Sequence, residues 1–301
     1  MDPSDLALGI DVGGTAIKAG AISGGRVLQR VETATPHDLE AFLDALAGLA
    51  RELAGGTALP PVGVGIPGFP APADGSILGA PNLPFLQGVP LGPALEERLG
   101  VPVRVDNDAN LAAWGEALRG AGRGRPDFLL ATIGTGIGGG LVLDGRLYRG
   151  PGGLAGEFGH LPVGHDRLCG CGARGCLEAA VSARSLAAWA REEGLEAADL
   201  RELAALARAG NGGARDLLRR AGALLGEALA QVALLLDLRV FVIGGGGAPV
   251  LDLLREPALQ VLVLRAFGRE REDFELLQAE LGNDAGFFGA AALALEAGAR
   301  A

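Results

Sequence analysis

The sequence is poor in several residue types, and each shortage argues against a class of protein. Lys18 is its single lysine, the other 25 of its 26 basic residues are arginines, and the net charge is −10. Because phosphate neutralisation supplies most of the affinity for nucleic acids, the lack of a basic cluster disfavours nucleic acid as a partner. No apolar run reaches the roughly 20 residues of a membrane span, and no basic leader precedes the first apolar stretch. We therefore expect a cytoplasmic protein that binds small molecules and no membrane.

Asparagine, threonine and cysteine are also scarce, which makes their clusters informative. Five asparagines, six threonines and three cysteines occur among 301 residues, against 51 glycines. At this glycine frequency, G-x-G pairs arise by chance. A useful motif must therefore contain the rarer residues.

The first half of the sequence predicts strands and helices in alternation. Residues 6–35 alternate apolar and small residues around two glycine turns, typical of three antiparallel strands. Apolar residues at helical spacing predict a helix from Pro36 to about Leu53, with Thr35 as its N-cap and Gly55 beyond its end. A buried strand (61–68), a loop (67–93), a short helix (91–100) and a strand that enters a helix at about Ala109 are expected to follow.

The second half repeats this order. Residues 126–150 again predict strand, glycine turn, strand, Asp-Gly turn and strand, so the sequence resembles a module duplicated about 120 residues later. Helices over about 182–236, a buried strand within 238–247 and a last helix over 285–298 complete the pattern. Alternating strands and helices indicate an α/β fold with two lobes and a cleft between them. In such sheets, ligands favour the carboxyl ends of the strands.

Two glycine turns contain a threonine and follow an apolar strand. In D-V-G-G-T, residues 11–15, the backbone N–H groups of Gly13 and Gly14 and the hydroxyl of Thr15 could bind a phosphate, and Asp11 could hold Mg²⁺. Thr135 in G-T-G-I-G-G-G, residues 134–140, takes the same place in the second module. Either turn taken alone is also compatible with an ordinary glycine hairpin that binds no phosphate. The dinucleotide-binding fingerprint is excluded, because a strand and not a helix follows each turn.

The sequence D-N-D-A-N, residues 106–110, holds two of the five asparagines at a strand-to-helix junction. Taken alone, this motif is explained equally well by a helix N-cap and by a catalytic role. In the functional reading, Asp108 accepts a hydroxyl proton as the oxygen attacks a γ-phosphoryl group, and Asn107 holds the sugar.

Cys169, Cys171 and Cys176 lie within eight residues, close to His160 and His165. Three cysteines and one histidine match the tetrahedral sulfur and nitrogen ligands of structural Zn²⁺. A C-x-C disulfide would be strained and would leave one cysteine over, which disfavours a disulfide. Spacing alone does not choose between the two histidines.

Together these motifs resemble the ROK family of repressors and sugar kinases, and within it the glucokinases. The resemblance rests on residues 11–15, 106–110, 134–140, 156–160 (G-E-F-G-H) and 169–178 (C-G-C-G-A-R-G-C-L-E) in the family's order and spacing. It extends from residue 6 to about 295. It implies the actin-like, ribonuclease-H-related ATPase fold, with a small lobe over 1–115 completed by a helix at 286–301. The large lobe would cover 116–285 and carry the zinc segment 156–178.

The resemblance also implies roles for individual residues. Asp108 would be the catalytic base of ATP-dependent hexose phosphorylation, most simply of glucose to glucose 6-phosphate. The hexose contacts would be Asn82, Asn107, Glu157, His160 and Glu178. Phosphate and Mg-ATP would be bound by Asp11, Gly13, Gly14, Thr15, Gly134, Thr135, Gly136, Gly138 and Gly139, and the adenosine side by Gly245. Structural zinc would be bound by His160, Cys169, Cys171 and Cys176.

The sequence departs from many relatives at one position and leaves several alternatives open. Ala16 stands where many relatives carry a lysine, and the five residues before the first strand leave no room for a repressor's helix-turn-helix domain. The alternatives are an N-acetylhexosamine kinase, a fructokinase, a non-catalytic sugar sensor and a nucleic-acid-binding zinc module. By analogy with the family, a homodimer or homotetramer is expected.

Overall fold

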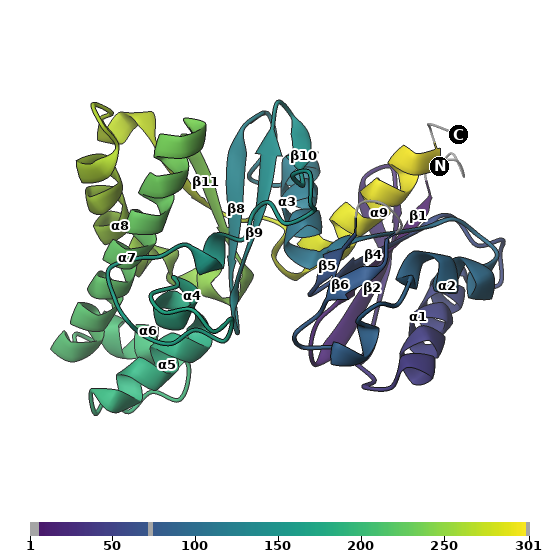
Figure 1. Cartoon of the computed structure of the whole chain (residues 1–301), viewed down its shortest axis with the longest axis horizontal. Helices are drawn as coiled ribbons and strands as arrows, with labels where there is room; N and C mark the ends of the chain where they lie inside the picture. Colours follow the sequence, from purple (N-terminus) through teal and green to yellow (C-terminus); the bar gives the residue numbers. More distant parts are fainter. Residues whose placement is uncertain (1–5, 72–74, 299–301) are drawn as a thin grey trace. The chain divides into compact units, whose positions relative to one another are not determined.

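The computed structural model describes residues 6–71 and 75–298, which divide into two compact units (Figure 1). Unit 1 takes the described residues up to Gly124, the segment Leu147–Ala155 and the residues from Asn283. Unit 2 takes Arg125–Arg146 and Gly156–Gly282. Part of the expected loop (72–74) and the end of the expected last helix (299–301) lie outside the described residues.

Unit 1 is built on one sheet with the strand order β3-β2-β1-β4-β7. Strands β1, β2 and β3 are antiparallel, whereas β1, β4 and β7 run parallel, so the carboxyl ends of these three meet at one edge. Its elements are β1 (Ala7–Val12), β2 (Ala16–Ser23), β3 (Arg26–Ala34), α1 (Leu39–Ala54), β4 (Val62–Ile66), β5 (Phe69–Pro70), β6 (Ile77–Gly79), η2 (Pro84–Leu86), α2 (Leu91–Leu99), β7 (Val103–Asn107), α3 (Asp108–Arg119), η6 (Gly282–Asp284) and α9 (Ala285–Gly298).

The two faces of this sheet are packed differently. One face buries the aliphatic side chains of β1 and β4 in a core shared with α1 and α2. On the other face, helix α9 lies directly on the strand backbones, since a Cβ atom on Gly63 would lie only 1.8 Å from the carbonyl oxygen of Ala290. A Cβ atom on Gly9 would lie 1.7 Å from that of Phe287. Because strand side chains alternate between faces, the sequence V-G-V-G-I of β4 encodes both surfaces.

Unit 2 repeats the same sheet with the order β10-β9-β8-β11-β12. Strands β8 and β9 are antiparallel, whereas β8, β11 and β12 run parallel, as β1, β4 and β7 do in unit 1. The elements are β8 (Phe128–Ile133), β9 (Ile137–Leu143), β10 (Arg146–Tyr148), η3 (Phe158–His160), α4 (Glu178–Val181), α5 (Ala183–Glu192), α6 (Leu200–Arg208), α7 (Gly212–Leu236), β11 (Val240–Gly244), η4 (Gly245–Val250), α8 (Leu251–Arg265), η5 (Arg271–Asp273) and β12 (Glu275–Gln278). The predicted duplicated α/β architecture is confirmed.

Several local expectations need correction. Helix α1 begins after Asp38, whose carboxylate accepts from the Ala41 N–H, because the hydroxyl of the expected cap, Thr35, donates instead to the Gly13 carbonyl oxygen. Its end at Gly55, with φ 58°, is as predicted. Helix α8 and strand β12 were not expected, since Pro257 lies inside the helix and the strand has four residues.

The unit boundary lies at Gly124 and not after residue 115, as predicted from the sequence. Helix α3 explains the difference, because it continues to Arg119 and packs against α9 of the same unit. The chain also returns to unit 1 for residues 147–155. In the described part of the chain, no helix has the combination of length and apolar character needed to cross a bilayer.

The glycine face of the unit 1 sheet generates a stability prediction. We expect Gly63→Ala to lower the free energy of unfolding by about 3 kcal/mol, at the upper end of the roughly 1–3 kcal/mol typical of overpacking. The matched control is Gly48→Ala in α1, where a Cβ atom meets nothing within 4 Å. There the better helix propensity of alanine is expected to add about 0.5–1 kcal/mol. Denaturant unfolding of both variants measures the difference, and effects of the same sign would contradict the packing of α9.

Candidate functional site

Two acidic residues lie at the carboxyl edge of the unit 1 sheet. Asp11 lies near the end of β1, and Asp108 directly follows β7 as the first residue of α3. A Cβ atom on Gly65 of β4, the strand between them, would lie 3.6 Å from Asp11 Oδ1 and 3.5 Å from the Cα of Asp108. The absence of a side chain at Gly65 therefore leaves room for two acidic residues side by side.

The carboxyl group of Asp11 is packed against backbone. A Cβ atom on Gly286, at the start of α9, would lie 2.4 Å from its Cγ, and Lys18 is its cross-strand neighbour on β2. Burial raises the pKa of Asp11 to about 6, while the charge of Lys18 acts in the opposite direction. A carboxylate that is costly to ionise without a cation fits the expected role in holding Mg²⁺.

The D-N-D-A-N turn is held by its own side chains. Asn107 is the N-cap of α3, where its Oδ1 accepts from the Asn110 N–H at 3.1 Å, and its Nδ2 donates to the Gly68 carbonyl oxygen at 3.1 Å. Asp108 Oδ1 accepts from the Ala109 N–H at 2.9 Å. The capping interpretation of this motif is thus correct for Asn107. It does not compete with the catalytic one, because Asp108 lies one residue beyond the cap.

The first glycine turn joins β1 to β2. Gly13 donates its N–H to the Ala16 carbonyl oxygen at 2.9 Å, and Thr15 accepts from the Thr35 N–H through its carbonyl oxygen at 3.0 Å. The side chain of Thr15 is exposed. Asn82, an expected sugar contact, lies beside the turn, because a Cβ atom on Gly14 would be 3.8 Å from its Cβ.

The second glycine turn joins β8 to β9 in unit 2. Gly134 donates to the Gly136 carbonyl oxygen at 2.8 Å, and Thr135 between them is exposed. Glu178 supports the turn, since its Oε2 accepts from the Ile137 N–H at 2.8 Å. Gly245, with φ 72°, follows β11 and packs on the end of β8, where a Cβ atom would lie 2.7 Å from the Ile133 carbonyl oxygen. These two turns of unit 2 therefore lie side by side.

Two details of the second turn differ from the sequence analysis. Thr15 is the third residue after its strand and Thr135 the second, so the two threonines do not take equivalent places. Gly139 lies within β9, where a Cβ atom would come within 2.3 Å of the Gly156 carbonyl oxygen. A packing requirement thus accounts for this glycine.

The three cysteines and His160 form one cluster. Their ligand atoms all lie within 4.8 Å of one another, a spacing and donor set that fit a tetrahedral zinc ion. His160 Nδ1 lies 3.7 Å from Cys169 Sγ. His165 is held elsewhere, because its Nε2 lies 3.0 Å from the Cys176 carbonyl oxygen and its Nδ1 accepts from the Arg167 N–H. Burial raises the pKa of Cys176 to about 12, so thiolates there would need a cation nearby.

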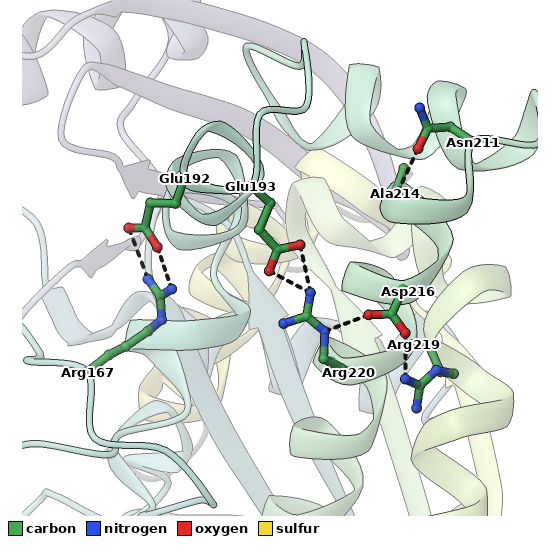
Figure 2. Close-up of polar contacts among 8 residues, drawn as sticks. All are labelled: Arg167, Glu192, Glu193, Asn211, Ala214, Asp216, Arg219 and Arg220. Atoms are coloured by element: carbon green, nitrogen blue, oxygen red, sulfur yellow. Dashed lines mark hydrogen bonds and ion pairs between the residues drawn. The ribbon is translucent and has the colours of Figure 1, made fainter.

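The segment that carries the cysteines is anchored to helix α5 through Arg167. Figure 2 shows Arg167 pointing at Glu192 and Arg220 lying between Glu193 and Asp216. The two guanidinium groups also lie over the ring of Trp189, 4.4 and 4.7 Å from its centroid. Arg167 lies between His160 and Cys169 in the sequence, so this contact holds the segment that carries the four proposed zinc ligands.

Three expected sugar contacts gather beside this cluster. His160 Nε2 lies 3.7 Å from Glu157 Oε2, and Glu178 Oε1 lies 3.8 Å from Cys169 Sγ. Burial raises the pKa of Glu157, and the charge of His160 acts against that shift. Since Nδ1 of His160 faces the cysteines, its Nε2 is the nitrogen left for another partner.

Sequence reasoning missed one residue that contacts the expected site. Arg149 Nε donates to Asp106 Oδ2 at 2.6 Å, which ties the segment 147–155 to the D-N-D-A-N turn. The two residues are 43 positions apart, and no local pattern signals such a pair.

Comparison with known proteins decides the family. The chain matches the ROK family over residues 7–297. It belongs to the ROK family. A glucokinase of Streptomyces coelicolor is 36% identical, with 97% of this chain and 98% of that protein covered. An N-acetylmannosamine kinase of Escherichia coli is 38% identical, with 95% and 97% covered.

A solved structure of this family has the same fold. The crystal structure of a ROK glucokinase from Streptomyces griseus, in complex with glucose and AMPPNP, is 35% identical. It superposes with a TM-score of 0.84 over 97% of this chain and 99% of that one. The predicted actin-like ATPase fold is thereby confirmed.

The buried carboxyl of Asp11 predicts a pH-dependent stability effect. Below about pH 4 the group is neutral in both states, but above its folded pKa of about 6 the folded protein must bury a charge. Stability is therefore lost as the pH rises between these values. We expect Asp11→Asn to raise Tm by roughly 2–4 °C at pH 8, about 1 kcal/mol, and to leave it unchanged at pH 4.

The control for this measurement is Asp216→Asn on the surface of α7. Arg219 lowers the pKa of Asp216, so its replacement is not expected to raise Tm at pH 8. Thermal unfolding at both pH values compares the variants. A Tm gain for Asp11→Asn that is equally large at pH 4 would contradict the burial of its charge.

Proposed function

We propose that this chain transfers the γ-phosphoryl group of ATP to a hydroxyl group of a hexose, with glucose as the preferred acceptor. The observation that carries the proposal is the pair of acidic residues, Asp11 and Asp108, that flank Gly65 at the carboxyl edge of the unit 1 sheet. Membership of the ROK family, whose relatives include glucokinases, supports it.

In this proposal Asp108 is the general base. The hexose oxygen, expected to be that of the 6-hydroxyl, attacks the γ-phosphorus of ATP, the bond to the β-phosphate oxygen breaks and ADP leaves. The hydroxyl proton passes to Asp108 Oδ. Because the transition state of phosphoryl transfer is loose, the carboxylate mainly orients the hydroxyl and receives its proton late.

The two glycine turns would bind the phosphates of ATP. Gly13, Gly14 and Thr15 present backbone N–H groups and a hydroxyl in unit 1, and Gly134, Thr135 and Gly136 do so in unit 2. Gly245 would contact the adenosine. Asp11 would hold Mg²⁺, which neutralises charge on the phosphates when bound.

The hexose contacts proposed here are Asn82 and Asn107 of unit 1 and Glu157, His160 and Glu178 of unit 2. Asn107 uses one amide hydrogen for Gly68, and its second N–H remains to donate to a hydroxyl. His160 would bind zinc through Nδ1 and a sugar hydroxyl through Nε2. A metal at this position would fix the orientation of the ring.

Zinc bound by His160, Cys169, Cys171 and Cys176 is part of the proposal. All three cysteines are free of disulfide bonds in the structure and so can serve as ligands. The ion would order the segment that carries two sugar contacts. Association into a dimer or tetramer stays a prediction.

A second candidate acceptor is an N-acetylhexosamine, because the Escherichia coli relative at 38% identity is an N-acetylmannosamine kinase. The same base and phosphate turns would serve either reaction. Only the pocket around the sugar's second carbon would differ.

Asp108→Asn tests the proposed reaction. We expect kcat to fall by roughly 10²–10⁴ while the KM for the sugar changes little, because the amide keeps the shape but accepts no proton. Coupled ADP-release assays with glucose, mannose, fructose and the N-acetylhexosamines measure turnover and identify the acceptor. Asp216→Asn serves as the control and should retain normal turnover.

Two outcomes of this assay would count against the proposal. Wild-type protein that turns over no sugar with ATP would overturn the kinase assignment. A variant at Asp108 with normal kcat would remove that residue as the base.

The metal assignment predicts the zinc content of three variants. Wild-type protein should carry about one zinc ion per chain, and Cys171→Ser and His160→Asn should lose it, since each lacks one of four ligands. His165→Asn should keep it, because His165 lies outside the cluster. Elemental analysis after dialysis measures the metal. Equal zinc in Cys171→Ser and wild type would contradict the site.

A further inference from the structure

An ion pair ties the segment 147–155 to the strand that ends at the proposed catalytic turn. Asp106 of β7 is only 4% exposed, and its Oδ2 accepts from Arg149 Nε at 2.6 Å. Among the ion-paired carboxylates of the described residues, that of Asp106 is the most buried. A buried carboxylate needs such a partner, because an unpaired charge in the interior is strongly destabilising.

The other oxygen of Asp106 organises the turn itself. Oδ1 accepts from the Asn107 N–H at 2.8 Å and from Asn110 Nδ2 at 3.2 Å. Asn107 in turn caps α3, whose first residue is Asp108. Hydrogen bonds therefore connect Arg149 to Asn107 through Asp106, and the proposed base is the next residue along the chain.

The path of the chain makes this link specific to the site. Within β10, after Arg146, the chain enters unit 1 for residues 147–155, and there the Arg149 carbonyl oxygen accepts from the Ala155 N–H at 3.0 Å. Directly afterwards it returns to unit 2 with Gly156, followed by the proposed sugar contacts Glu157 and His160. The segment 147–155, which Arg149 holds against β7, is thus followed directly in the sequence by the proposed sugar contacts.

We propose that Arg149 is a positioning residue for phosphoryl transfer, acting through Asp106 on the orientation of Asp108; this inference rests on the proposed function. Without the guanidinium group, the buried carboxylate of Asp106 is uncompensated and two residues from the base. It would be stabilised by turning towards water, which breaks its hydrogen bonds to Asn107 and Asn110. Small displacements of a catalytic group lower kcat strongly, because reacting atoms must be held in near-attack geometry.

A purely structural ion pair would behave differently from a positioning residue. It would lower Tm and leave the kcat of the folded protein unchanged. Arg104 provides the matched control, because it lies on the same strand, two residues before Asp106, and pairs with Glu96 at 3.4 Å. The guanidinium group of Arg104 donates to Glu96 and to the Val103 carbonyl oxygen, both outside the turn.

The experiment compares Arg149→Met, Arg149→Lys and Arg104→Met in the full-length chain, with ATP and the best hexose. We expect Arg149→Met to lower kcat at least tenfold with the hexose KM within threefold of wild type, and Arg149→Lys to recover part of the loss by restoring the charge. Arg104→Met should stay within twofold of wild type in kcat. Tm is recorded for each variant, and kcat is measured well below it.

Other results of this experiment would contradict the positioning role, the charge compensation or the proposed function. If the kcat of Arg149→Met equals that of Arg104→Met, the positioning role is wrong, and equal losses in Arg149→Met and Arg149→Lys would rule out charge compensation. Wild-type protein without turnover overturns the proposed function, and with it this inference. If Arg149→Met unfolds at the assay temperature, Asp106→Asn/Arg149→Met replaces it, since the buried charge is then absent. Its kcat should be no lower than that of Asp106→Asn alone, and a further loss would overturn the link through Asp106.

Discussion

Direct contact between backbones is the constraint on which this protein is built. In unit 1, helix α9 lies on β1 and β4 where glycines expose the strand backbones, and Gly289 lets the same helix approach Leu111 of α3. In unit 2, Gly222 and Gly226 of α7 lie against the backbone of α8, and Gly159 lies against that of Ile137. Dispersion contacts between close-packed backbones replace the side-chain layer that usually separates such elements. Much of the glycine excess therefore serves packing.

The same constraint creates the site. Because Gly65 and Gly286 have no side chains, the carboxyl group of Asp11 and the backbone of Asp108 can lie at the edge of the sheet where strands β1 and β7 end. The acidic residues of the candidate site thus lie where side chains at Gly65 and Gly286 would otherwise be. Asp11 illustrates the cost, since its buried carboxyl group has a pKa raised to about 6. Stability is lowered at the position where a cation would be held.

The sequence was sufficient for the repeated succession of strands and turns along the chain, the two glycine turns and the cysteine cluster, because each is encoded by neighbouring residues. Predictions from the sequence were wrong where a contact between residues distant in the sequence determines the local structure. Thr35 would be a good helix cap by local rules, yet its hydroxyl is bonded to Gly13, and Asp38 caps the helix. Helix α8 escaped notice because Pro257 interrupts its pattern. Among site residues, the choice of His160 over His165 agrees with the folded geometry, whereas Arg149 could be found only there.

The position of α9 in the chain has a consequence for biosynthesis. This helix covers one face of the unit 1 sheet, but it is the last described element to be translated. The strands of the unit 1 sheet are made first, and their glycine-lined face stays uncovered until the 177 residues between β7 and α9 and then α9 itself have been synthesised. Unit 2, complete at Gly282, can close before unit 1 does. The order of synthesis and the order of completion are thus reversed, and the nascent N-terminal sheet is the part of the chain that a chaperone would meet exposed.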